Sequence, residues 1–196
     1  MALTSCAAAI TKSFAAECAS PLDNGYTGRA VIFDARDITP TISGTDPRTV
    51  TGITVASGKT PFAVINDGDN PFTGSNFAST SENGRREYVK TVAFLDPKRG
   101  AAASKDVDAL AALPLGFVVV AEKMSRVADG GFEVIGVYKG LKVNGDGITR
   151  DEYANGGAIA ITASTRERYS EVVYNEGTYA DNLAEFEGWL SAAPAQ

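Results

Sequence analysis

The stretch TGITVASGKTPFAVI (51–65) holds the first residues whose types and spacing could do chemistry, because it approximates a phosphate-binding loop. Such a loop has the pattern G-x-x-x-x-G-K-[ST], and a helix that follows it points its N-terminus at the phosphate. Here five residues, not four, separate Gly52 from Gly58, and the residues after Lys59 include a strand-like FAVI. We therefore expect no nucleotide site but a hairpin turn, in which Gly58 serves the turn and Lys59 is a solvated tip.

A second candidate site is KVNGDGITRDEY (142–153), which approximates a calcium-binding loop. Such a loop needs an Asp at its first position and a bidentate Glu at its twelfth. Lys142 and Tyr153 stand at these positions, so we expect a solvated turn and no metal. A weak site built from carboxylates of irregular loops stays open as an alternative. Its candidate ligands are Asp146, Asp151 and Glu152, or Asp67 and Asp69.

Catalytic constellations are difficult to assemble from this composition. The chain has no histidine, which removes the commonest general base and every metal site that contains histidine. Its two cysteines, Cys6 and Cys18, cannot make a four-thiolate zinc site, and the sequence leaves open whether they form a disulfide or are two small buried residues. The 24 Asp and Glu residues make carboxylate pairs by chance, but no nucleophile motif accompanies them. We expect a protein that is not an enzyme and that uses no cofactor.

Length and charge narrow the class of protein further. A chain of 196 residues predicts one domain with a sizeable core. A formal net charge of −6 argues against a basic patch that grips nucleic acid. The longest apolar runs are far shorter than the ~20 residues of a membrane-spanning helix, so we expect no membrane partner.

The elements that must position these residues are mostly short strands. Glycines, prolines and β-branched runs predict a mainly β fold, that is, a β-rich α+β class built as an antiparallel β-sandwich or a small barrel. TPTISGTDP (39–47) is expected to be a connector. The segments expected to contain strands are 28–38, 50–56, 62–65, 87–97, 116–123, 131–143 and 156–173, with hairpins joining 50–56 to 62–65 and 116–123 to 131–143.

Two helices complete the expected set, a short one near 104–113 and a C-terminal one near 179–191. Ser104 is a candidate cap for the first helix, with acidic residues in its first turn. Thr178 is a candidate cap for the second, with Asp181 at the capping-box position. The residues expected to share one apolar face of the second helix are Tyr179, Leu183, Phe186 and Leu190.

The expected domain organisation is an N-terminal arm over 1–27 followed by a single β-rich domain over 28–196. Within this domain, 66–86 is the longest polar stretch, and we expect it to be a long loop. Loops of about this length are uncommon in compact domains and are usually functional or disordered.

Candidate contact residues lie in the arm, at the tip of the predicted turn and in the polar stretch. Aromatic residues and arginine are enriched at the cores of protein interfaces, which makes such residues plausible anchors for a partner. The alternative is a flexible loop with incidental residues. The candidates for an assembly interface are Phe14, Lys59, Phe72, Phe77, Arg85 and Arg86.

A family resemblance comes from two regions. GFVVVAEK…GGFEVIGVYKGLKV, followed by GGAIAITASTRERYSEVV, resembles tailed-phage virion proteins of the tail-tube type. SCAAAITKSFAAECASPLDNGYTGRAVIFDARDI is similar to the openings of structural proteins from phages of Bacteroidetes-type hosts, in which a Cys-containing start leads into a first strand that ends near an Asp-Ile. The likeness lies in the spacing and the general residue pattern of the segments, and it covers about the first 40 residues and the last 90.

The resemblance implies a β-sandwich or small barrel with a packed helix. It also implies subunits that form rings, usually hexameric, which stack into a tube that conducts DNA. The implied partners are further copies of the chain, other tail or neck proteins, and DNA only as non-specific cargo. The implied location is the virion, assembled in the cytoplasm of the bacterial host. Head, neck and capsid-decoration proteins share this texture and stay open as alternatives.

The residues themselves are compatible with this hypothesis. Arms and long loops can supply the head-to-tail contacts that rings need, and strand addition between neighbours would build a continuous sheet. A negative net charge suits a subunit that lines a lumen, because the lumen would then repel DNA. The leading hypothesis is therefore a non-enzymatic virion structural protein, most closely a tail-tube subunit. The alternatives are a carbohydrate-binding β-sandwich, with or without calcium, and an enzyme that uses a carboxylate pair.

Overall fold

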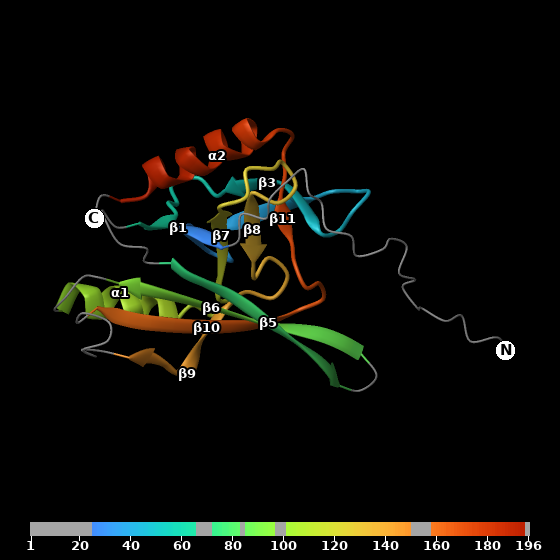
Figure 1. The fold of residues 1–196 in the computed structure, drawn as a ribbon. Coiled ribbons are helices and arrows are strands. Elements are labelled where there is room, and N and C mark those ends of the chain that lie inside the picture. The colour runs from blue at the N-terminus through green and yellow to red at the C-terminus, as the bar shows by residue number, and fades with distance from the viewer. Residues whose placement is uncertain (1–24, 66–71, 83–84, 97–100, 150–157, 195–196) are drawn as a thin grey trace.

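The computed structural model describes residues 25–65, 72–82, 85–96, 101–149 and 158–194 (Figure 1). Most of the expected arm over 1–27, with Phe14, Cys6 and Cys18, lies outside these ranges, but its last two residues, Tyr26 and Thr27, belong to the first strand and not to an arm. The described elements, in chain order, are β1 (Tyr26–Asp34), β2 (Ile38–Ile42), β3 (Thr49–Val55), β4 (Phe62–Val64), β5 (Phe72–Glu82), β6 (Arg85–Asp96), α1 (Ala101–Ala111), β7 (Phe117–Lys123), β8 (Phe132–Ile135), β9 (Lys142–Thr149), β10 (Ile159–Glu167), β11 (Val173–Tyr174) and α2 (Tyr179–Ala192).

The strands form two sheets. One has seven strands in the order β2-β3-β11-β8-β7-β1-β4, and the other has four in the order β5-β6-β10-β9. Neighbouring strands are antiparallel, except that β11 runs parallel to β3. The sheets do not close into a barrel, so the mainly β class is confirmed in its sandwich-like form. Helix α2 covers the outer face of the seven-stranded sheet, and the four-stranded sheet lies against its inner face (Figure 1).

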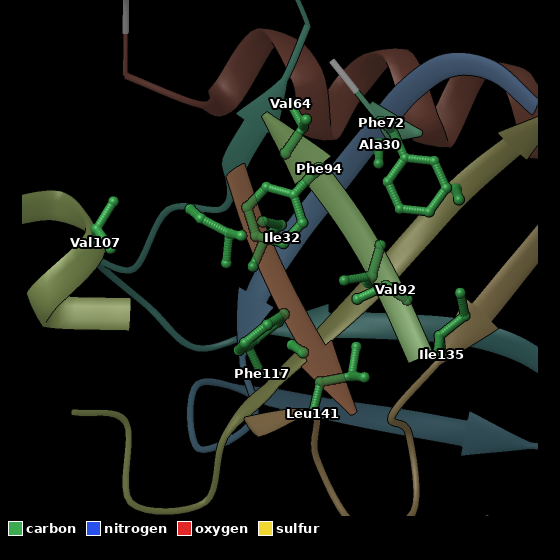
Figure 2. Close-up of a cluster of buried hydrophobic side chains, with 14 of the residues drawn as sticks. Ala30, Ile32, Val64, Phe72, Val92, Phe94, Val107, Phe117, Ile135 and Leu141 are labelled. Atoms are coloured by element: carbon green, nitrogen blue, oxygen red, sulfur yellow. The ribbon is translucent and has the colours of Figure 1, made fainter. Parts of the chain in front are cut away.

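The apolar runs of β1 and β7 are continuous because both faces of the seven-stranded sheet are buried. Successive side chains of a strand point to opposite faces. In β1, Ala30 and Ile32 pack between the two sheets, whereas Val31 and Phe33 pack under α2. The alternation repeats in β7, where Phe117 faces the other sheet (Figure 2). Burial on both faces explains why these strands lack the polar alternation of a half-exposed strand.

Helix α2 begins where the sequence predicts. Thr178 is its N-cap: the Thr178 hydroxyl accepts a hydrogen bond from the Asp181 amide at 3.2 Å. The Asp181 carboxylate in turn accepts one from the Thr178 amide at 3.0 Å, which completes a capping box. Phe186 is fully buried on the face that packs against the sheet. The predicted cap and the predicted apolar face are both confirmed.

An ionic network fastens α2 to the sheet. Arg29 of β1 donates to Glu122 of β7 at 2.8 Å and to Glu187 of α2 at 2.6 Å. The Thr27 hydroxyl also donates to Glu122, at 2.7 Å. Burial alone would raise the pKa of the Glu122 carboxyl, but the hydrogen bonds from Arg29 and Thr27 outweigh burial and hold that pKa below its usual value.

Several expectations about the elements need correction. Strands occupy 50–55 and 62–64, but β3 pairs with β2 and β11 while β4 pairs with β1, so these two strands do not form a hairpin. The connector at 39–47 contains most of β2. Helix α1 begins at Ala101, which places Ser104 inside it and leaves no acidic residue in its first turn. The described part of the expected loop at 66–86 is a β-hairpin, β5–β6.

Candidate functional site

The β5–β6 hairpin divides into two halves with different surroundings. At one end, Phe72 is 2% exposed, and its ring meets that of Tyr26 edge to face at 5.1 Å. Val92 and Phe94 of β6 are buried at the same end (Figure 2). The ring of Phe72 is thus enclosed within the chain, which corrects its expected place in a solvent-exposed loop.

The other half of β5 is uncovered on both faces. The four consecutive residues Asn76, Phe77, Ala78 and Ser79 are all exposed. Because successive side chains alternate between faces, β5 itself is uncovered on both faces here, although Lys90, opposite Phe77 on β6, is buried. The hydrogen-bonded register with β6 nevertheless continues through this half to Glu82. The hairpin therefore extends beyond the body of the sandwich, as Figure 1 shows.

The outer edge of β5 has features that favour pairing with another strand. Among the described strands, β5 is an end strand of its sheet and pairs with β6 alone. Proteins usually protect long edge strands with charged residues, proline or bulges. The run FTGSNFASTS (72–81) has neither charge nor proline, and the register shift lies near its start, between Phe72 and Gly74. The remaining stretch is a regular edge that can accept a strand.

Phe77 is the largest apolar group on this uncovered half. Its side chain is 57% exposed, and its ring meets that of Tyr88 on β6 edge to face, with centroids 5.9 Å apart. Phe62 on β4 is exposed to the same degree, at 56%, but lies at the edge of the other sheet. Of the predicted contact residues with described side chains, Phe77 has the surroundings expected of an anchor for a partner.

The other predicted contact residues fall in different places. Phe14 lies outside the described residues. Arg85 and Arg86 begin β6, opposite Glu82 and Ser81, but their side chains lie outside the described part of the chain. Lys59 follows β3, so it belongs to the flank of the seven-stranded sheet and not to the sheet that contains Phe77.

The turn at Gly58 is confirmed, although it does not join paired strands. Gly58 has a φ of +76°, and the Lys59 amide donates to the Ala56 carbonyl at 3.1 Å. The Lys59 ammonium lies 3.2 Å from an oxygen of Asp37. Gly52 is part of strand β3, and strand β4 follows the turn, so the helix of a phosphate-binding loop does not follow here.

The predicted calcium alternatives receive no support from the described residues. Asp146 lies in β9, a strand paired with β10, and not in a solvated turn. Within the ranges that the structure describes, no three Asp, Glu or Cys residues gather in an arrangement that holds a metal ion. Asp67, Asp69, Asp151 and Glu152 lie outside those ranges.

A hollow of about 250 Å³ opens where β2 approaches the loop between β8 and β9. Its lining is mostly apolar, with Ile38, Leu115 and Val118 among the residues. Lys139 and Lys142 supply its charged groups. The lining thus combines apolar surface with positive charge and contains no carboxylate.

A buried polar cluster lies between the two sheets, and sequence reasoning missed it. Lys90 of β6 is 1% exposed, and its ammonium donates to Oε1 of Glu133 on β8. The Tyr26 hydroxyl donates to Oε2 of the same carboxylate, and the Ser75 hydroxyl lies 3.3 Å from Oε2 and 2.5 Å from the Tyr26 oxygen. Burial and the Glu133 carboxylate raise the pKa of the Tyr26 hydroxyl, so it stays a donor.

A further carboxyl, that of Glu167, adjoins this cluster from β10. Glu167 is 1% exposed, and neither of its oxygens has a hydrogen-bond partner among the described residues. Burial raises its pKa and outweighs the opposing influence of the backbone at Tyr138 and of the Lys90 ammonium. Burial therefore disfavours the charged form of this carboxyl, as expected of a buried position without a partner.

The sequence does carry one signal of this cluster. In VKTVAF, Lys90 stands two and four residues before the inward-facing Val92 and Phe94, so alternation places it in the core. Glu133, between two buried apolar neighbours in FEVI, gives a weaker signal because both faces of its strand are covered.

Fold and surface together define a mainly β protein with two facing sheets, one covered by a helix and the other with an open edge. Comparisons of the chain with protein-family models, with curated proteins and with solved structures gave no match. Among the described residues, no helix has both the length and the apolar character needed to cross a membrane.

Proposed function

We propose that the chain is a non-enzymatic virion structural protein, most closely a phage tail-tube subunit that assembles into rings through its four-stranded sheet. The observation that carries this function is the outer half of β5, a regular, uncharged sheet edge that is uncovered on both faces. An isolated two-stranded ribbon is only marginally stable in water, so a strand from a neighbour would stabilise it. Strand addition is a common way for proteins to use such an edge.

The order of the four strands favours a head-to-tail contact. Each of the three pairings, β5–β6, β6–β10 and β10–β9, is antiparallel, so the two outer strands β5 and β9 run in opposite directions. A second copy that continues the sheet in the same orientation places its β5 antiparallel to the first copy's β9. Because this contact joins two different surfaces, it can repeat around a ring and close.

The resemblance to tail-tube proteins extends the proposed ring to a stack of rings, usually hexameric, around a lumen. The net charge of −6 suits a lumen in which DNA is a non-specific cargo, since like charges repel. The partners are other copies of the chain and further tail or neck proteins, and the location is the virion.

Negative-stain microscopy of the purified full chain tests this function. We expect closed rings, and tubes at higher protein concentration. Rings that never stack would favour a neck or head protein over a tube subunit. A chain that stays monomeric at all concentrations and is absent from virions would contradict the structural role.

Two matched substitutions locate the contact. Phe77→Glu places a charge on the uncovered half of β5, and we expect it to abolish ring formation while the protein stays folded. Phe62→Glu changes an equally exposed phenylalanine on the other sheet, and we expect rings to persist. If rings were lost in Phe62→Glu but kept in Phe77→Glu, the contact would lie on the seven-stranded sheet, and the proposal would be contradicted.

A further inference from the structure

Two arginines share one tyrosine ring on the surface of the chain. The guanidinium carbon of Arg48, which precedes β3, lies 5.5 Å from the centre of the Tyr169 ring, and that of Arg168 lies 5.4 Å from it. The Tyr138 ring meets the Tyr169 ring edge to face, with centroids 5.9 Å apart, and the Tyr138 hydroxyl donates to the Pro47 carbonyl. These contacts hold the turn before β3 against the segment between β10 and β11. We call Arg48, Tyr138, Arg168 and Tyr169 the arginine–tyrosine surface.

Neither arginine of this surface has an ionic partner among the described residues. Both are exposed, whereas the neighbouring cations Lys139 and Arg166 lie 2.8 and 4.0 Å from oxygens of Glu87. A guanidinium that rests on an aromatic ring is already oriented, so it loses little freedom when an anion binds. Tyrosine and arginine are also among the residue types that dominate the binding energy of protein interfaces. The surface is therefore suited to an acidic partner.

The last part of the chain carries an acidic surface of this kind. No lysine or arginine follows Arg168 in the sequence, whereas five acidic residues do. Three of the five have a role within the chain, two in ion pairs and one in the cap of α2: Glu171, Glu187 and Asp181. Burial, Glu176 and Glu185 all raise the pKa of the Tyr174 hydroxyl, which places both exposed carboxylates near that hydroxyl. Glu176 and Glu185 thus form an acidic surface beside α2, on the outer side of the seven-stranded sheet (Figure 1).

We propose that the arginine–tyrosine surface of one copy of the chain binds the acidic surface of a second copy. The two surfaces lie on opposite sides of β11, since Arg168 and Tyr169 come before this strand and Glu176 comes after it. Because the contact joins two different surfaces, it can repeat from one copy to the next. The proposal rests on the proposed function for the identity of the partner. It adds a contact that does not use the edge of β5.

Charge favours a second copy over nucleic acid as the partner. The chain has a net charge of −6, which opposes the approach of a polyanion as a whole. Two copies instead present opposite charges to each other at the contact, and such complementarity guides association and fixes its register. Because the charged groups are exposed, the contact should weaken steeply as salt rises.

Sedimentation of the full chain carrying Phe77→Glu tests this contact, because that substitution is expected to remove the contact at the β5 edge. We expect self-association at about 0.01 M salt and monomers at about 1 M salt, since the Debye length falls from about 30 to about 3 Å. Adding Arg168→Glu should weaken the association about tenfold or more, and so should adding Glu185→Arg. Adding both should restore it, because the two charges are then exchanged. Lys105→Glu makes the same charge change at an exposed residue of α1 and is the matched control, which should leave the association unchanged.

Several results would overturn the proposal. One is a Phe77→Glu protein that stays monomeric at low salt, and another is a charge exchange that fails to restore the association. A third is an equal weakening by Lys105→Glu and by Arg168→Glu. Single-stranded DNA that binds the wild type but not the Arg168→Glu protein would assign the surface to nucleic acid instead. Failure of the proposed function is a separate result: a wild type without rings contradicts the ring contact, whereas a salt-sensitive association that Arg168→Glu removes would still support this one.

Discussion

The strand pairs β1–β7 and β5–β6 are both antiparallel, yet their surroundings are opposite. Ala30 and Val120 belong to strands with a sheet on one side and a helix on the other, and both are fully buried. Ala78, at the outer end of β5, is exposed and has one neighbouring strand. Burial is therefore concentrated in the centre of the seven-stranded sheet, whereas the outer end of the hairpin is exposed, and this end is the proposed contact with a neighbouring subunit.

The difference shows how the same backbone pairing can serve folding or assembly. Burying a large apolar side chain contributes about 1.5–3 kcal/mol, and the central strands gain this on both faces. The outer hairpin gains almost nothing from burial within the chain. Under the proposed function, its regular edge and its exposed Phe77 are covered only when a neighbouring subunit packs against them.

The largest expected effect is the difference in unfolding free energy between truncating a phenylalanine in the central sheet and truncating one in the outer hairpin. Phe132 in β8 is fully buried; its ring stacks on that of Tyr179, with centroids 5.7 Å apart, and meets the tilted ring of Phe186 at 5.1 Å. We expect Phe132→Ala to lower the free energy of unfolding by about 3–5 kcal/mol. Phe77→Ala should change it by less than about 1 kcal/mol in the monomer. Urea unfolding measures both, and equal losses would contradict the contrast between the regions.

The network that fastens α2 to the sheet should give the next largest effect. We expect Arg29→Gln to lower the free energy of unfolding by roughly 1–3 kcal/mol at pH 7, because Glu122 is buried while Arg29 is partly exposed. The pKa of Glu122 is lowered in the folded protein, so this stabilisation is complete above the usual glutamate pKa and is lost as pH falls through the lowered value. Urea unfolding at pH 7 and at pH 3 should therefore show a smaller difference between variant and wild type at pH 3. A loss that is equal at both pH values would show that the carboxylate charge of Glu122 does not contribute.

The cap of α2 should give a smaller effect. Thr178→Ala removes the hydroxyl that accepts from the Asp181 amide, and we expect a loss of about 1 kcal/mol. Thr178→Ser keeps the hydroxyl and is the matched control. Thermal unfolding followed by circular dichroism measures both variants, and an equal shift in the serine variant would indicate that the methyl group, and not the cap, matters.

The turn at Lys59 should give the smallest effect. Its ion pair with Asp37 is largely exposed, and such pairs contribute about 0–1 kcal/mol. We expect Lys59→Glu to change the unfolding free energy by less than about 1 kcal/mol and to leave rings intact, because the turn belongs to the other sheet. Sedimentation analysis checks the assembly, and loss of rings would add this turn to the contact surface.

Features with a local cause could be predicted from the sequence. The runs AVIF and FVVVA mark the two central strands because burial on both faces demands continuous apolar residues. The cap at Thr178 depends on only four consecutive residues, from Thr178 to Asp181, and the structure contains it as predicted. The turn at Gly58 likewise follows from its neighbours.

Features that depend on distant parts of the chain could not be predicted. The strand ending at Val55 pairs with β2 and β11 and not with β4, a choice that the sequence around Gly58 does not encode. The β5 strand was hidden because its residues beyond Phe72 are mostly small and polar, with Phe77 as the one large apolar residue, so apolar alternation is missing. The cluster around Glu133 joins residues from four strands, and only the packing of the two sheets brings them together.

Hydrogen exchange along β5 tests most directly whether this edge is the assembly surface. In the monomer, the alternate amides of 74–80 that point away from β6 should exchange rapidly, since they have no strand to bond. In the assembled protein we expect these amides to become protected, and in Phe77→Glu at the same concentration we expect them to stay unprotected. Assembled rings in which the outward amides of β5 exchange as fast as in the monomer would contradict strand addition at this edge.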